Sequence, residues 1–320
     1  MTKMEAIDDR EPAMPGDART PSKHRRPHPS VAFIRLARPK QWLKNALVFS
    51  STAAAGKLFV PHYLLPTIAA AAIFSLAASG LYMVNDARDA ESDRHHDLKR
   101  LRPVAAGWIS PRAATLAGLS LVIIGFALGL LLDAQFAMAL GAYVLLTLGY
   151  SLGLKNQPVI DISIVALGFL LRAIAGALAT GLPISVWFLT VAAFGSLFMV
   201  SGKRYGEAKE AGHLAAEHRA VLGTYSPAFL NYVRSLSSAV AIAGYGLWAF
   251  EGFRLTSGYI YVQLSTVPFV VAILLYALQA DLGNAGTPED VILHNRPIQV
   301  VGTIWALLIL IGLYLPHLGR

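Results

Sequence analysis

Three aspartates in the stretch YMVNDARDAESDRHHDLKRLRP are spaced so that one helix would carry them on one face. Asp86, Asp89 and Asp93 are three and then four residues apart, and residues with that separation are neighbours on a helix surface. Carboxylate oxygens suit Mg2+, which keeps several waters and bridges to substrate phosphates, and Asn85 adds a neutral oxygen. The pattern therefore predicts a magnesium site formed by Asn85, Asp86, Asp89 and Asp93, in which the three aspartates are catalytic.

The prediction of a metal depends on the lack of another counter-charge at this depth. Like charges on one helix face repel each other unless a cation lies between them, and no protein cation is expected deep enough to satisfy three carboxylates. The alternative is a solvated acidic helix end that is neutralised by Arg88, Arg94 and Lys99. We favour the metal site because the pattern N-D-x-x-D-x-x-x-D follows directly on a long apolar run.

The elements that must position this motif are membrane spans. The chain has 320 residues, of which 55% are hydrophobic and only 14% charged, whereas soluble domains average about 25% charged residues. Because a span needs roughly 17–25 apolar residues, we predict nine spans, near 43–60, 63–84, 111–132, 135–154, 158–180, 184–201, 226–249, 259–279 and 298–317. There are no cysteines, which excludes disulfides, thiolate metal sites and cysteine nucleophiles.

The basic residues predict the orientation of these spans. If the amino terminus lies inside, the outer connections hold only Lys57 and Arg254, with Arg320 at the extreme end. That distribution follows the positive-inside rule and predicts a multi-pass protein of the inner (plasma) membrane, with its amino terminus and active site at the cytoplasmic face. The net charge of +8 therefore indicates cytoplasmic loops and anionic lipid, and no nucleic-acid partner.

The domain organisation is simple. Residues 1–30 are polar, rich in proline and charge, and have no apolar core of the kind found in signal peptides. We expect a disordered cytoplasmic tail over 1–30 and a single catalytic membrane domain over 31–320. The inner loops after the second and sixth spans are expected to form a cap that excludes water from the site.

Two charged residues fall inside the predicted span 158–180. Asp161 lies near its start, where it would either cap the helix or face a polar cavity. Arg172 lies eleven residues further, about three turns or roughly 16 Å deeper on nearly the same face. A charge at that depth normally faces a cavity or a partner. We favour a shared cavity, in which Arg172 either contacts a phosphate or fixes an acid.

The chain resembles the UbiA superfamily of intramembrane prenyltransferases from Val31 to its end. The resemblance is carried by the aspartate-rich motif, the nine spans, the long inner loops and the element YSLGLK after the fourth span, which ends at Lys155. It implies an all-α, nine-helix transmembrane bundle of the UbiA type with cytoplasmic cap loops. It also implies that Lys155 meets substrate phosphate, and it leads us to expect a homo-oligomer.

One departure from the superfamily pattern concerns the region after the sixth span. A second D-x-x-x-D motif is usual there, but this chain reads SGKRYGEAKEAG, so Lys203 and Arg204 stand where acid is expected. Glu207 is the only nearby carboxylate on the Tyr205 side. Lysine binds phosphate as a point charge, and arginine can bind it through two parallel hydrogen bonds. The replacement favours substrates that carry more phosphate than those of an ordinary aromatic prenyl transfer.

The segments RPKQWLKN, DISIVALGFLLRAIAGALATG and GSLFMVSGKRYGE are similar to a phosphoribosyltransferase branch of the superfamily. That resemblance implies transfer of 5-phosphoribose from 5-phosphoribosyl 1-diphosphate to polyprenyl (decaprenyl) phosphate, with release of diphosphate, for a cell-wall arabinan precursor. The predicted substrate-binding residues are Lys44, Asn85, Lys155, Asp161, Arg172, Lys203, Arg204, Tyr205 and Glu207. For each basic residue the alternative is simple anchoring at the lipid surface by snorkelling.

Two other functions compete with this one. The chain could be an ordinary UbiA-type prenyltransferase that moves a polyprenyl group from its diphosphate to an aromatic acceptor, although the missing second acidic motif argues against it. A transporter or lipid-binding protein is the other alternative. Transporters often carry charges near the membrane midplane, whereas the acidic residues of this chain gather at one predicted face.

Overall fold

The computed structural model describes residues 28–95, 99–212, 220–251, 259–284 and 288–318. Residues 1–27 of the predicted tail lie outside this range, as does part of each predicted cap loop. All the regular elements in the described residues are helices, which confirms the all-α class. The α-helices and 3-10 helices (η) that carry the argument are α1 (Pro29–Ala37), η1 (Pro39–Leu47), α2 (Val48–Ala54), α3 (Pro61–Arg88), α4 (Ala90–Arg94), α5 (Pro111–Leu132), α6 (Ala134–Leu152), η3 (Leu154–Asn156), α7 (Ile160–Thr180), α8 (Val186–Ala211), η5 (Ala220–Gly223), α10 (Pro227–Glu251), α11 (Tyr259–Leu264), α12 (Thr266–Asp281), α13 (Pro288–His294) and α14 (Arg296–Leu318).

Seven helical stretches in the described residues are long and apolar enough to cross a membrane: α3, α5, α6, α7, α8, the α11–α12 pair and α14. Each coincides with a predicted span, although α8 continues to Ala211, ten residues beyond its predicted end. The predicted span 226–249 is also one helix, α10, but it lies outside this set of seven. The chain is therefore a multi-pass membrane protein built from helices.

The first predicted span differs most from the structure. In place of one helix over 43–60, the chain forms η1 and then the short α2, which ends at Ala54, and it turns at Gly56 with φ +68°. Proline begins η1, and Asn45 within it is 2% exposed. A buried amide needs hydrogen-bond partners, and those of Asn45 come from other helices. Tertiary contacts therefore interrupt this segment.

Glycines allow the closest approaches between the helices. A Cβ atom added to Gly80 of α3 would lie 2.4 Å from the Gly118 carbonyl oxygen of α5. A Cβ atom added to Gly176 of α7 would lie 1.9 Å from the Val48 carbonyl oxygen of α2. Small residues let helix backbones pack closely in lipid, where van der Waals contact drives association. These contacts fix α3 and α7, the helices that carry Asp86 and Asp161.

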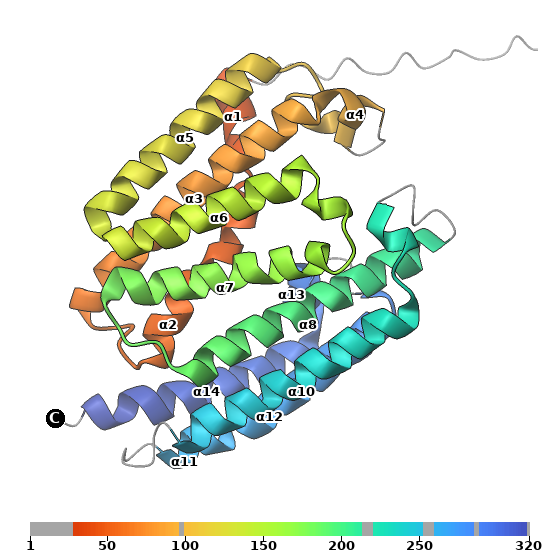
Figure 1. Cartoon of the computed structure of the whole chain (residues 1–320). Coiled ribbons are helices and arrows are strands. Elements are labelled where there is room, and N and C mark those ends of the chain that lie inside the picture. The colour runs from red at the N-terminus through yellow and green to blue at the C-terminus, as the bar shows by residue number, and fades with distance from the viewer. Residues whose placement is uncertain (1–27, 96–98, 213–219, 252–258, 285–287, 319–320) are drawn as a thin grey trace, which may run out of the picture.

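The chain connections give the bundle two unlike ends (Figure 1). At one end lie α4, the end of α8 and the start of α10, and at the opposite end lie α2, α11 and the end of α14. At the second end α14 meets the amino-terminal segment, because the Tyr314 hydroxyl donates to the Ala53 carbonyl oxygen at 3.1 Å. The charged motifs all belong to the first end, where the described parts of the loops after α4 and α8 pack buried residues against the helix ends.

Candidate active site

One face of α3 holds η1 and Arg38, the residue that precedes it. The face is a row of side chains at helical spacing, Ser75, Ser79, Tyr82 and Asp86. The Asn45 amide donates to the Ser75 hydroxyl and the Trp42 indole donates to the Ser79 hydroxyl, each at 2.9 Å. The Arg38 guanidinium lies 5.2 Å from the centre of the Tyr82 ring. Asp86 ends the row, so the segment delivers Arg38 to it.

Two buried aspartates and two arginines form a first charge cluster where α3 meets α4. Arg38 forms an ion pair with Asp86. Nη1 of Arg102 lies 3.3 Å from Asp86 Oδ1 and 2.7 Å from Asp93 Oδ2. The two carboxylates are 3% and 6% exposed, whereas both guanidiniums are 30% exposed. The acids are therefore held inside the protein, and their cations reach them from a more open side.

This arrangement corrects part of the metal-site prediction. The helix does continue past Arg88, with a bend at Asp89, which lies between α3 and α4 and whose amide donates to the Asn85 carbonyl oxygen at 2.9 Å. The three aspartates, however, are not gathered, because the described residues contain no group of three or more histidine, cysteine or acidic side chains placed to hold a metal ion. The expectation that no protein cation reaches the aspartates is wrong, since Arg38 and Arg102 both do.

A second charge cluster joins α6, α7 and α8. The Arg204 guanidinium binds both carboxylate oxygens of Asp161, at 2.7 and 3.1 Å, and donates to Glu207 at 2.6 Å. The Tyr150 hydroxyl donates to Asp161 at 2.9 Å and lies 3.3 Å from Arg204. Lys203 lies 3.8 Å from Glu207. Asp161 and Arg204 are 0% and 4% exposed, so this ion pair is almost fully enclosed.

The contacts of this second cluster bear on two predictions, the helix-capping role of Asp161 and the phosphate-binding role of Arg204. Asp161 does not cap α7, whose N-cap is Val159, and its carboxylate binds Arg204. Binding of phosphate by Arg204, as predicted, would compete with contacts inside the protein, because three of its nitrogen atoms already bind acids or Tyr150. Lys203 is 36% exposed and is the more open of the two basic residues that replace the second acidic motif.

Strained turns lead into both clusters. Arg38 and Val159 are the two non-glycine residues of the described chain with positive φ, at 53° and 67°. A positive φ is rare for any non-glycine residue and is an outlier for a β-branched one. Such strain persists where surrounding contacts enforce it. Arg38 is held by its pair with Asp86, and the Val159 amide donates to the Tyr225 hydroxyl at 2.9 Å.

Arg172 is separate from both clusters and has neutral partners. Its guanidinium donates to the Asn45 side chain at 2.8 Å, the Tyr143 hydroxyl at 2.9 Å and the Gly168 carbonyl oxygen at 2.6 Å. It also lies 4.6 Å from the centre of the Tyr143 ring. The predicted cavity shared with Asp161 is not seen in these contacts, and none of these partners is an acid. A phosphate contact for Arg172 stays a prediction.

Four other predicted substrate-binding residues lie at half-buried positions. Lys44 in η1 and Lys155 in η3 are half-buried. Asn85 and Tyr205 are half-buried too, and the Arg234 guanidinium lies 5.0 Å from the centre of the Tyr205 ring.

Several residues at the site were missed by sequence reasoning as specific partners. They are Arg38, Arg102, Asn45, Tyr143 and Tyr150. From the sequence, the two arginines were expected only to add positive charge at the inner face. Arg38 nevertheless begins the segment RPKQWLKN, and Arg102 lies in the aspartate-rich stretch. Tyr150 begins the YSLGLK element, so its sequence signal was present. Tyr143 is a single polar side chain in an apolar segment, and Asn45 stands beside Lys44 at the start of one, which is a weaker signal of buried pairing.

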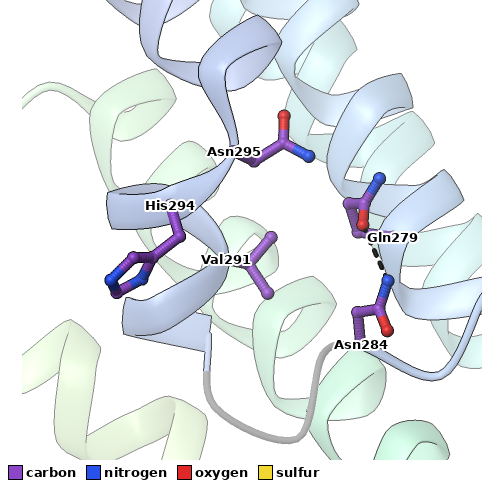
Figure 2. A pocket seen from close by; sticks show the side chains of 5 residues that line it. All are labelled: Gln279, Asn284, Val291, His294 and Asn295. Atoms are coloured by element: carbon purple, nitrogen blue, oxygen red, sulfur yellow. Dashed lines mark hydrogen bonds between the residues drawn. The ribbon is translucent and has the colours of Figure 1, made fainter.

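A separate hollow of about 530 Å3 lies between α12, α13 and the start of α14. Figure 2 shows the five residues that line it, Gln279, Asn284, Val291, His294 and Asn295. Gln279 and Asn284 are hydrogen-bonded to each other at 3.0 Å. No lysine, arginine or acidic side chain is among its described lining residues, so these five residues offer no charged group to a diphosphate.

The fold and the charge clusters define a multi-pass helical membrane protein with paired acids and bases at one end. The description of the family model that matches residues 46–295 is the UbiA prenyltransferase family, so the chain belongs to that family. This confirms the resemblance drawn from the sequence. The interpretation as a transporter or lipid-binding protein does not fit a family of prenyltransferases.

Among curated proteins, the chain is similar to enzymes named decaprenyl-phosphate phosphoribosyltransferase. The protein from Corynebacterium glutamicum is 41% identical over 303 residues, covering 92% of this chain and 91% of the relative. The protein from Mycobacterium tuberculosis is also 41% identical, over 279 residues that cover 86% of this chain and 92% of the relative.

Solved structures share the fold at low sequence identity. A UbiA homologue from Archaeoglobus fulgidus bound to DMAPP and Mg2+ matches with a TM-score of 0.67 and 18% identity, over 88% of this chain and 97% of that one. A structure described as digeranylgeranylglyceryl phosphate synthase matches with a TM-score of 0.64 and 16% identity, over 89% of this chain and 98% of that one. These likenesses confirm the UbiA fold.

Proposed function

We propose that this protein transfers 5-phosphoribose from 5-phosphoribosyl 1-diphosphate to a polyprenyl phosphate, decaprenyl phosphate in the first instance, and releases diphosphate. The observation that carries the proposal is the 41% identity, over nine-tenths of both chains, with the phosphoribosyltransferase of Corynebacterium glutamicum. The basic pair Lys203 and Arg204 in place of a second acidic motif supports a substrate set rich in phosphate.

The first charge cluster is suited to the departing diphosphate. The carboxylates of Asp86 and Asp93 supply hard oxygen ligands, and one nitrogen of Arg102 lies within 3.3 Å of both. A position for a cation between the two acids therefore exists, and their chemistry fits Mg2+, with Asp89 and Asn85 near in sequence. When bound, Mg2+ would neutralise negative charge on the diphosphate leaving group. Arg38 and Arg102 would then be available to donate to phosphate oxygens.

The second charge cluster is suited to holding groups in place. Arg204 fixes Asp161 and Glu207, and Tyr150 fixes the same aspartate. Lys203, at the edge of this cluster, would contact substrate phosphate. No general base is required, because the acceptor is already an ionised phosphate that attacks the anomeric carbon of the donor while the bond from that carbon to the diphosphate breaks.

Transfer assays with labelled donors test this proposal. Purified protein with polyprenyl phosphate and labelled 5-phosphoribosyl 1-diphosphate should form a labelled lipid and free diphosphate. The activity should disappear in excess EDTA and return with Mg2+. Transfer from a polyprenyl diphosphate to an aromatic acceptor, with none from the phosphoribosyl donor, would contradict the proposal and support the ordinary prenyltransferase.

We also propose that the charge clusters face the cytoplasm, in the inner membrane. The basic residues support this orientation by the positive-inside rule. The chain has no cysteine, so a cysteine introduced at the exposed Ser92 in α4 is the only thiol. An impermeant thiol reagent should label it in inverted vesicles and leave it unlabelled in intact cells. Labelling from outside intact cells would reverse the proposed topology.

A further inference from the structure

Helix α10 carries an arginine that the charge clusters do not use. Arg234 is largely buried, with 12% of its side chain exposed, and its guanidinium covers the Tyr205 ring of α8 at 5.0 Å. Nη2 lies 3.6 Å from a carboxylate oxygen of Asp281 at the end of α12, and that aspartate is 60% exposed. Nη1 is buried with no hydrogen-bond partner among the described residues. The guanidinium is therefore only partly satisfied by the protein.

A second unsatisfied group lies on the same face of α10. Asn231 precedes Arg234 by three residues, a spacing that places both side chains on one side of a helix. Its Oδ1 atom is also buried without a hydrogen-bond partner in the described part of the chain. Buried polar atoms are nearly always paired with protein, water or a ligand. The unpaired Arg234 donor and the unpaired Asn231 acceptor can therefore both bind one polar ligand that is not part of the chain.

The position of Arg234 relates it to the proposed site. Tyr205 directly follows Arg204 on α8, and consecutive helical residues point about 100° apart. Arg204 binds Asp161 of α7 while Tyr205 contacts Arg234 of α10. Arg234 therefore lies at about the same depth as the second charge cluster, on another side of α8. The Arg204 guanidinium already pairs with Asp161 and Glu207, whereas Nη1 of Arg234 has no hydrogen-bond partner among the described residues.

We propose that Arg234 and Asn231 form a binding subsite for a phosphate monoester. The inference rests on the proposed function, in which the donor carries a 5-phosphate and the acceptor a lipid phosphate, both in addition to the diphosphate. A guanidinium recognises phosphate oxygens through parallel N–H bonds. The Oδ1 atom of Asn231 accepts from an O–H group of the same ligand, which is a ribose hydroxyl in the donor or the P–OH group of a singly ionised lipid phosphate. Asp281, which is exposed and only loosely paired, is the group that the phosphate displaces from Arg234.

Binding measurements on the full-length protein in lipid nanodiscs test the subsite. The probes are 5-phosphoribosyl 1-diphosphate, the same donor without its 5-phosphate, polyprenyl phosphate and polyprenol. Arg234→Gln should weaken binding of one phosphorylated probe by about tenfold to a hundredfold and leave binding of its dephosphorylated counterpart unchanged. The identity of the weakened probe assigns the subsite to the donor or to the lipid.

Two further variants separate ligand binding from a structural role. Asp281→Asn removes the competing carboxylate, so its affinity for the phosphorylated probe should stay the same or increase. Arg234→Lys keeps the charge without the planar donor group, and its affinity should fall between those of wild type and Arg234→Gln; it also serves if the glutamine variant does not fold. Ser235→Ala, at an exposed position on α10, is the matched control.

The proposal is overturned if Arg234→Gln and Arg234→Lys bind all four probes as the wild type does. It is also overturned if Asp281→Asn loses affinity and thermal stability in parallel with Arg234→Gln, because that result assigns Arg234 to a structural ion pair. A wild-type protein that transfers no phosphoribose refutes the proposed function separately. The comparison of polyprenyl phosphate with polyprenol then decides the subsite without the donor.

Discussion

The two charge clusters contain similar groups but differ in how their cations are held. At the junction of α3 and α4, two enclosed aspartates are paired with arginines that are 30% exposed. Between α7 and α8, the arginine itself is 4% exposed and the aspartate 0%. An exposed cation is solvated by water when it leaves its partner, whereas breaking the enclosed pair leaves both of its charges buried.

This difference suggests that the two clusters have different roles, one in catalysis and one in stability. The first cluster has acids that are fixed and cations that can be exchanged, which suits the arrival and departure of a charged substrate with its metal. The second cluster has an enclosed arginine held by Asp161, Glu207 and Tyr150, which suits a rigid support. Substitutions in the first cluster should therefore change catalysis more than stability, and those at the centre of the second should change stability more.

The largest expected effect is on stability, at the centre of the second cluster. Arg204→Gln leaves Asp161 buried without its cation, and such a loss costs about 3–5 kcal/mol. The melting temperature of the purified protein should fall sharply. The matched control, Arg38→Gln, removes the same charge from a partly exposed position and should cost clearly less, because Arg102 still pairs with Asp86.

A double variant checks that the cause is the unpaired aspartate. Asp161→Asn combined with Arg204→Gln removes both charges, so it should be more stable than Arg204→Gln alone, and the two substitutions should not be additive. Equal destabilisation by Arg38→Gln and Arg204→Gln would remove the contrast between the two clusters.

The next effect is on turnover, in the first cluster. Asp86→Asn keeps the shape of the side chain but removes its charge, and phosphoribosyl transfer should fall by about 100-fold or more, as when one electrostatic group is removed from a reacting centre. The melting temperature should change little, because the freed arginines are partly exposed. The measurement is the transfer of labelled phosphoribose at saturating substrate.

Asp133→Asn is the control for Asp86→Asn. Asp133 caps α6 by accepting from the Phe136 amide at 2.8 Å, and asparagine is an equally good cap. Both its activity and its stability should match the wild type. If Asp86→Asn retained full turnover, the first cluster would not be the site of the reaction.

Much of the fold could be predicted from the sequence because most helices are single apolar runs bounded by proline or glycine. The segment that became η1 and α2 was the exception. Its conformation depends on Asn45, which pairs with Ser75 of α3 and with Arg172 of α7. Such partners lie 30 and 127 residues away in the sequence, so no local pattern reveals them.

The candidate site was predictable by residue type but not by pairing. The spacing of the aspartates identified Asp86 and Asp93, and depth within a span identified Asp161. Two of the cations that satisfy them come from distant parts of the chain: Arg38 is 48 residues from Asp86, and Arg204 is 43 from Asp161. A single sequence gives the charges on one membrane face, and the fold decides which of them meet.

The smallest expected effect concerns Lys203, at the edge of the second cluster. Its ammonium lies 3.8 Å from Glu207 and is 36% exposed, and an ion pair of that kind contributes at most about 1 kcal/mol. Lys203 can therefore turn to a substrate phosphate, unlike Arg204. Lys203→Ala should raise the Michaelis constant for 5-phosphoribosyl 1-diphosphate by about tenfold, near the lower limit for losing one charged hydrogen-bond partner, with little change in melting temperature.

The control and the donor analogue determine which phosphate Lys203 contacts. Lys209→Ala removes an exposed lysine further along α8, which donates to the Asp281 carbonyl oxygen, and should leave the constant unchanged. If Lys203 binds the 5-phosphate, a donor without that group should react with wild type and Lys203→Ala alike, because the two losses involve one interaction. If only the Michaelis constant for polyprenyl phosphate increased, Lys203 would contact the phosphate of the acceptor. If neither Michaelis constant changed, Lys203 would be an anchor at the lipid surface, and every residue of the second cluster would have a structural role.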